Sequence, residues 1–112
     1  MESESKRIIE FIAKVTPIKI GLFVSIWKRN DMEITVPQDI SDNWDYMIIQ
    51  CQDGQNSGYF KFPKDILVQK QVVSSPSSRG INGMRVYPNW VKALNPNAIK
   101  AQKWQSQYFI SN

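Results

Sequence analysis

Aromatic and cationic side chains stand together at three places in this chain, a pairing suited to binding a polyanion that carries flat bases. Lysine and arginine neutralise phosphates, and aromatic faces stack on unpaired bases. The three segments are Trp27-Lys28-Arg29, Arg85-Val86-Tyr87-Pro88-Asn89-Trp90 and Lys103-Trp104. They make a nucleic acid the natural candidate partner, provided that the fold brings such residues onto one face.

The predicted binding residues come from these segments and from the cations around them. Arg85 ranks first, because a cation on a strand between Met84 and Val86 needs a partner or a ligand. The apolar spacing around Trp27 and Trp104 favours the core for both, and Lys28-Arg29 at a helix C-terminus would simply stabilise the helix dipole. We expect phosphate contacts and base stacking from Lys14, Lys19, Lys28, Arg29, Arg79, Arg85, Lys100 and Lys103, with Tyr87, Trp90 and Trp104 as the stacking residues.

Several classes of catalytic and metal site are excluded by missing residue types. The chain has no histidine and one cysteine, Cys51. General-base catalysis by histidine, catalytic triads that use histidine, and zinc sites of histidine and cysteine are therefore excluded, as is an internal disulfide. We expect no cofactor; a bound metal would have to be a hard ion such as Mg²⁺, held by carboxylates.

The net charge of +4 is unevenly distributed, because none of the ten acidic residues follows Asp65. This asymmetry favours an anionic partner, although a cationic surface that only keeps the protein soluble explains it equally well. The segment after Asp65 carries the cations Lys70, Arg79, Arg85, Lys92, Lys100 and Lys103.

Length and hydropathy predict one soluble domain. A chain of 112 residues can bury a core without disulfides or metal. Its start, Met1-Glu2-Ser3-Glu4-Ser5, is polar and acidic, unlike a signal peptide. No apolar run approaches the roughly 20 residues that span a bilayer. We expect a cytoplasmic protein without membrane contact, in keeping with its single cysteine.

The first 30 residues predict a strand followed by a helix. Residues 5–15 alternate as in a strand, with one face formed by Ile9, Phe11, Ala13 and Val15. Thr16 and Pro17 are typical of an N-cap and a first helical residue, so we expect a helix over 17–29 that buries Ile18, Leu22 and Ile26. A strand stays open as the alternative, because a period of two also relates Ile20, Leu22, Val24 and Ile26.

The rest of the chain predicts a hairpin, a mobile loop and a C-terminal helix. After a polar connection at 32–44, we expect strands at 44–51 and 59–62 joined by turn signals, then a short helix or turn at 64–70. A loop at 74–83 carries Arg79 and precedes a strand at 84–87. A helix at 97–109, capped by Asn97, would have an inner face of Ala101, Trp104, Gln105 and Tyr108.

These elements give an α+β fold class, with a mixed or antiparallel sheet of four to five strands and flanking helices.

The chain resembles the MepB family, small bacterial proteins sometimes encoded beside a multidrug efflux pump. The resemblance keeps its order and spacing from Ala13 to Phe109. It is carried by Ala13-Lys14-Val15-Thr16-Pro17-Ile18-Lys19-Ile20-Gly21, Phe23-Val24, Trp27-Lys28-Arg29, Phe62-Pro63-Lys64, Arg85-Val86-Tyr87-Pro88 with Trp90, and Ala101-Gln102-Lys103-Trp104-Gln105 with Tyr108-Phe109.

The resemblance implies a single MepB-like domain over 1–112, a restriction-endonuclease-like fold similar to the PD-(D/E)XK endonucleases, and a nucleic-acid partner. It implies no particular activity. The strong motif begins close to Met1, so we expect the N-terminal part of the family domain to be missing or shortened, and the sheet to be incomplete or completed by a partner. Ile18 also replaces the threonine expected between Pro17 and Lys19.

A nuclease of that type needs carboxylates for one or two Mg²⁺ ions and a lysine beside the attacking water. Glu10 and Lys14 share a strand face but lie about 13 Å apart, which is too far to serve one water. Asp45, at the start of the central strand, is the nearest candidate metal ligand, with Asp42 and Asp65 as weaker ones. A surface carboxylate, or a partner for one of the many lysines, is the favoured interpretation of each acid.

The leading hypothesis is therefore a nucleic-acid-binding protein, for DNA or RNA, without established catalysis. One alternative is an active or degenerate Mg²⁺-dependent nuclease. Another is an interaction module that binds an acidic protein through the same basic surface. A homo-oligomer is compatible with the sequence.

Overall fold

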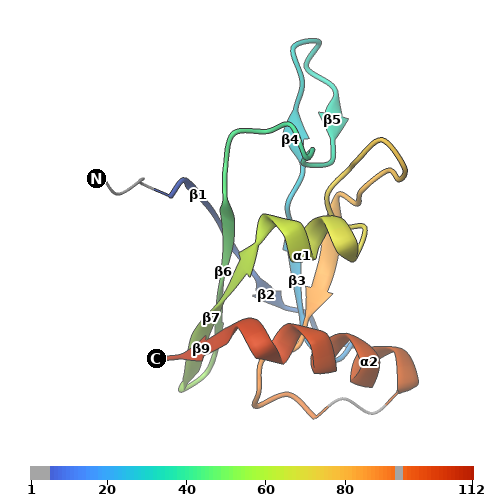
Figure 1. Ribbon diagram of the computed structural model, residues 1–112. Helices are drawn as coiled ribbons and strands as arrows, with labels where there is room; N and C mark the ends of the chain where they lie inside the picture. The colour runs from blue at the N-terminus through green and yellow to red at the C-terminus, as the bar shows by residue number, and fades with distance from the viewer. Residues whose placement is uncertain (1–5, 93–94) are drawn as a thin grey trace.

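The protein has an α+β fold in which two sheets enclose one core and two helices pack against the strands (Figure 1). The computed structural model describes residues 6–92 and 95–112. None of the described helices is long and apolar enough to cross a membrane.

The larger sheet is mixed. Its first strand runs parallel to the second, and the other neighbours are antiparallel. Alternate residues of the central strands face the core, where Met47, Ile49, Phe60 and Phe62 are buried. The spatial order is β1 (Ile8–Ile12), β6 (Tyr46–Asp53), β7 (Asn56–Pro63) and β9 (Phe109–Ser111).

The predicted hairpin is confirmed as β6 and β7. Its register pairs Asp53 with Asn56, which leaves a two-residue loop. Gly54, in that loop, has φ +62°, a left-handed conformation that glycine adopts without steric cost.

The smaller sheet is antiparallel and carries the residues discussed below. Its order is β2 (Lys14–Val15), β3 (Leu22–Ser25) and β8 (Gly83–Val86). Beyond β3 the chain forms a separate two-stranded hairpin of β4 (Lys28–Arg29) and β5 (Thr35–Val36), which projects past both sheets (Figure 1).

The predicted helix over 17–29 is wrong, and the strand alternative is right. Leu22, Val24 and Ile26 are all buried at a spacing of two, between the two sheets. Gly21 has φ +84°, which no α-helix contains. Thr16 and Pro17 gave a local cap signal, but the pairing of β3 with β8, which buries Leu22, Val24 and Val86, decides the conformation.

The C-terminal helix is shorter than predicted. The helix α2 (Pro96–Gln105) is capped by Asn95 rather than Asn97: Asn95 Oδ1 accepts a hydrogen bond from Ala98 N at 2.8 Å. It continues as a 3-10 turn, η1 (Ser106–Tyr108), and then as the unpredicted strand β9. Its inner face is as expected, since Gln105 is buried and Ala101, Trp104 and Tyr108 are partly buried.

The predicted single sheet of four to five strands is also too simple, because the described residues form nine strands in three sheets. The connection expected at 32–44 contains β5. The short helix is confirmed as α1 (Lys64–Gln69), and the loop at 74–83 leads into β8 as expected.

Gln105 protects the outer edge of β8. Its side chain is 1% exposed, accepts a hydrogen bond from Tyr87 N at 2.9 Å and donates one to Arg85 O at 3.1 Å. The amide thus pairs with the two backbone groups that a further strand would otherwise pair with. This contact fixes α2 against β8.

Candidate functional site

A cation, an aromatic ring and a second cation form a row across the smaller sheet. Phe23 of β3 lies directly opposite Lys14 of β2 on one side and Arg85 of β8 on the other. Directly opposed residues project from the same face of a sheet. The neighbouring pair Leu22 and Val86 is buried, so the row projects from the outer face.

Arg85 is the best-held residue of this row. Its Nη1 donates to the carbonyl oxygens of Ile20 at 3.1 Å and Gly21 at 3.2 Å, and its Nη2 donates to Thr16 Oγ1 at 2.7 Å. The guanidinium carbon lies 6.0 Å from the centroid of the Phe23 ring. Thr16 therefore positions the arginine instead of capping a helix.

The positive charge of Arg85 is not neutralised within the described residues. Their side chains form one ion pair, between Lys28 and Asp42. All three acceptors of Arg85 are neutral oxygens, which occupy only part of its five N–H donors and do not cancel its charge. A partly buried cation held in this way favours the arrival of an anion.

Gly21 lets the backbone come close enough to hold Arg85. A Cβ at this position would lie 2.8 Å from the Tyr87 ring and 2.8 Å from Val86 O. Together with its φ of +84°, this close approach makes glycine the only residue that fits without strain. The carbonyls of Ile20 and Gly21 are thereby directed at the guanidinium.

Two hollows lie beside this row. One, of about 440 Å³, is lined by Lys19, Arg85 and Tyr87 together with Ile18, Ile20 and Asn95. The other, of about 380 Å³, is lined by Lys14, Thr16 and Phe23 together with Ile12, Val15 and Ser25. The fold therefore brings four predicted binding residues to one face, namely Lys14, Lys19, Arg85 and Tyr87.

The other predicted cations lie elsewhere. Lys28 forms the ion pair with Asp42, so its charge is compensated. Arg79 is exposed in the loop at 74–83, and Lys100 and Lys103 are exposed on α2. Arg29, in the projecting hairpin, lies over the Trp27 ring with its guanidinium carbon 5.2 Å from the ring centroid.

The predictions for the tryptophans are partly wrong. Trp27 was expected in the core but is 39% exposed. Side chains alternate between the two faces along β3 and just after it, and Trp27 is on the outward-facing side of this alternation. Trp104 does pack against the core, with its ring centroid 5.4 Å from that of Phe62. Trp90 also packs inward, edge-on to Phe109 with centroids 5.7 Å apart, so it is poorly placed to stack on a base.

Phe23 is an exposed aromatic residue that sequence reasoning did not name as a binding residue, and Trp27 is one that it named but expected in the core. The sequence did contain a signal for them, which is the period of two over Leu22, Val24 and Ile26. When these three residues are buried, the residues between and after them, Phe23 and Trp27 included, face outward. The helix prediction hid it.

The candidate catalytic acids do not meet. Glu10 lies on the outer face of the larger sheet, where its Oε2 accepts a hydrogen bond from Gln50 Nε2 at 3.2 Å. Asp45 Oδ2 accepts one from Arg7 N at 2.8 Å. Lys14 lies on the smaller sheet. Among residues 6–92 and 95–112, no three acidic or cysteine side chains are grouped so that they could hold a metal ion.

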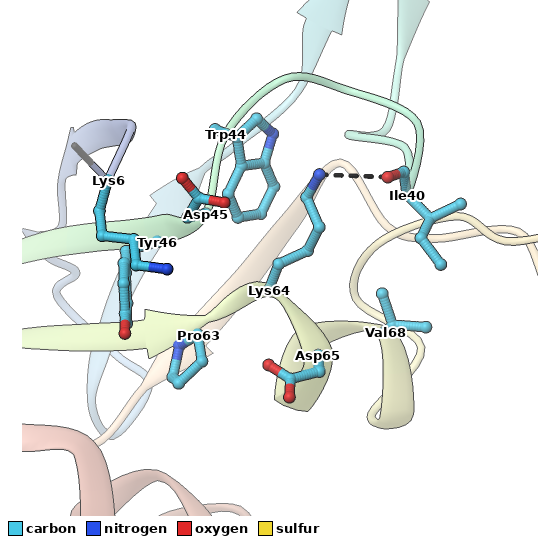
Figure 2. Close-up of a pocket in the computed structure, with 9 residues that line it drawn as sticks. All are labelled: Lys6, Ile40, Trp44, Asp45, Tyr46, Pro63, Lys64, Asp65 and Val68. Atoms are coloured by element: carbon cyan, nitrogen blue, oxygen red, sulfur yellow. Dashed lines mark hydrogen bonds between the residues drawn. The ribbon is translucent and has the colours of Figure 1, made fainter. Parts of the chain in front are cut away.

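Asp45 and Asp65 do line a hollow of about 370 Å³ near the start of β6 (Figure 2). Lys64 crosses this hollow and donates to Ile40 O at 3.1 Å (Figure 2). It also donates to Asp42 O. Its ammonium also lies 4.8 Å from the centroid of the Trp44 ring. The Lys64 ammonium thus already contacts two backbone carbonyl oxygens and the Trp44 indole ring, which suits a structural role.

The comparisons with known proteins agree on one family. The sequence matches the MepB-like family over residues 1–111. The structure is similar to a crystal structure of MepB, with a TM-score of 0.92 and 34% identity, over 98% of this chain and 74% of that one. No curated protein matches. The chain therefore belongs to the MepB-like family.

Proposed function

We propose that this protein binds nucleic acid, without catalysis, through the outer face of the smaller sheet. The observation that carries the proposal is the row of Lys14, Phe23 and Arg85, in which Arg85 keeps its charge while three neutral oxygens fix its position. Lys19 and Tyr87 adjoin the row.

The chemistry of this face fits phosphates better than single carboxylates. Arginine presents a planar fork that matches phosphate oxygens, and the exposed lysines add point charges on either side. Aromatic rings between the cations offer stacking surfaces that a protein carboxylate does not use. An acidic protein is the alternative partner, and it would exploit the charges alone.

The nuclease alternative has less support. Asp45 and Lys14 line different hollows and Glu10 lines neither of them, whereas metal-assisted hydrolysis needs its carboxylates and lysine around one phosphate. The mixed sheet with flanking helices supports the further proposal of a restriction-endonuclease-like fold that has kept a binding role. A cytoplasmic location, where nucleic acid is accessible, belongs to the same proposal.

The proposal is tested by fluorescence anisotropy with a labelled oligonucleotide at low salt. Replacing Arg85 with glutamine removes the central charge, so we expect affinity to fall about tenfold. Arg79→Gln removes an equal charge from the exposed loop and should bind within about twofold of the wild type.

Arg85 also holds the backbone through its hydrogen bonds to Ile20 O and Gly21 O, so its replacement can disturb the fold. A second variant is therefore needed to separate a loss of binding from a loss of folding. Lys14 and Lys19 are both exposed, so the double change to glutamine leaves the fold intact. It too should weaken binding. Wild-type affinity in both the Arg85 variant and this double variant would overturn the proposal, as would the absence of any binding by the wild type.

A further inference from the structure

The outer face of the smaller sheet continues along the chain into the projecting hairpin. From Leu22 to Ile26 every second residue is buried, and a hydrogen bond from Ile26 N to Asn82 O at 2.9 Å extends the pairing of β3 and β8 by one residue. The intervening residues Phe23, Ser25, Trp27 and Arg29 are all exposed. They form a strip that runs away from the core.

This strip carries two aromatic rings, each with an arginine over it. Arg85 lies over Phe23, and Arg29 lies over Trp27. Although both rings make these contacts, Phe23 is still 40% exposed and Trp27 is 39% exposed. An aromatic side chain in the core would be close to fully buried, so these rings are available to a ligand.

The Phe23 ring and the arginine over Trp27 are both held in position before any ligand arrives. The Phe23 ring lies across β8, because a Cβ on Gly83 would lie 2.5 Å from its Cζ atom; glycine leaves room for the ring. Arg29 is held by a hydrogen bond from Nη1 to Glu33 O at 3.3 Å. Its hairpin is shaped by Asn30, whose Oδ1 accepts from Met32 N and Ile34 N.

The spacing of the rings suits a strand whose bases are separated. Four residues of extended chain place Phe23 and Trp27 about 13 Å apart. In a duplex each base is stacked between its neighbours and its faces are covered, so two such rings would find no surface. In a single strand the bases can turn out and stack on them, as bases do on aromatic platforms.

We propose that the preferred ligand is a single-stranded nucleic acid, with unpaired bases stacked on Phe23 and Trp27 and the adjacent phosphates near Arg85 and Arg29. The inference rests on the proposed function, which names only the class of polymer. Beyond Arg29 the hairpin tip carries the acids Asp31 and Glu33, so the strand leaves the surface before the tip.

The test compares two forms of one labelled oligonucleotide, single-stranded and annealed to its complement, at the same salt. Wild type should bind the single strand about tenfold more tightly. Trp27→Ala should lose about tenfold in affinity for the single strand and little for the duplex, because only the unpaired bases stack. Trp27→Phe retains a ring and should recover most of the affinity.

A matched control is Ile34→Ala, which removes an exposed apolar side chain from the same hairpin. It should bind both forms as the wild type does. Thermal unfolding of each variant verifies that the hairpin change leaves the fold intact.

The outcomes separate this inference from the proposed function. Equal wild-type affinity for both forms, or Trp27→Ala binding the single strand normally, would overturn the inference and leave the proposed function standing. No binding of either form would overturn both. Equal losses on both forms in Trp27→Ala would also contradict stacking and point to a lost charge contact through Arg29.

Discussion

At the scale of single residues, Arg85 is the residue on which the proposed binding surface depends most. A buried or half-buried cation is costly unless its donors are paired. Here the pairing comes from two carbonyls and one hydroxyl, contributed by the segment between β2 and β3. That segment matches the family motif in the sequence, so the motif has an identifiable structural role, which is to shape the support of Arg85.

Gly21 is the residue on which this support depends most. Gly21→Ala should lower the free energy of unfolding by about 2–5 kcal/mol, since it adds a steric clash to a strained left-handed conformation. The matched change is Gly54→Ala, at φ +62° with no atom within 4 Å of the new Cβ. It should cost only the strain, about 1–2 kcal/mol.

Urea denaturation of the two glycine variants measures both values. Equal losses would show that the contact of Gly21 with Tyr87 and Val86 imposes nothing beyond its backbone conformation.

Cys51 gives a prediction about reactivity. Burial raises the pKa of its thiol from 9.0 to about 12. The folded protein therefore keeps the thiol protonated at neutral pH and should react slowly with iodoacetamide, but rapidly once unfolded in urea. Because the folded pKa is raised, burial of the neutral thiol contributes to stability below pH 9, and that contribution is lost as the pH rises toward 12.

Mass spectrometry of the alkylated protein follows this reaction. Rapid alkylation of the folded protein near pH 8 would contradict the burial of Cys51.

At the scale of elements, β3 shows what a sequence can predict here. The β6–β7 hairpin, α1 and β8 were all predictable, because each has a clear local period or turn signal. The strand predicted over residues 5–15 is confirmed only as far as β1, because the strand breaks at Ala13 and the chain continues as β2 in the smaller sheet, where Val15 is exposed. The segment after Thr16 has two competing signals, a helix cap and a period of two. Its partner β8 lies far along the chain, so local propensity did not decide between them.

The contact of α2 with β8 yields a prediction about stability. Gln105→Leu fills the same space but leaves Tyr87 N and Arg85 O unpaired, so we expect a loss of about 2–5 kcal/mol in the free energy of unfolding. Gln107→Leu, on the exposed side of η1, should change it by less than about 0.5 kcal/mol. Amide hydrogen exchange at Tyr87 should also become faster in the Gln105 variant.

A Gln105 variant that is as stable as the Gln107 variant would show that the β8 edge is protected by something other than this amide.

At the scale of the whole molecule, the surface depends on two sheets meeting. The chain passes from β1 in the larger sheet straight to β2 in the smaller one, and this places Lys14 beside Phe23. Lys14, Lys19, Arg85 and Tyr87 could each be predicted from the sequence as single binding residues. Their grouping follows from strand register, which the sequence does not state, whereas the outward positions of Phe23 and Trp27 follow from the period of two that the helix prediction set aside.

The salt dependence of binding tests the central claim most directly. Single-stranded DNA binding is measured over a range of salt concentrations for the wild type and for the Lys14→Gln/Lys19→Gln double variant. Each lost phosphate contact reduces the slope of log K against log salt by about 0.7, so the double variant should have a slope shallower by about 1.4.

A double variant at Lys61 and Lys70 removes the same charge elsewhere, where each ammonium lies over an aromatic ring of another surface. It should keep the slope of the wild type. A slope that is unchanged in Lys14→Gln/Lys19→Gln, or no salt dependence in the wild type, would contradict phosphate binding at this face.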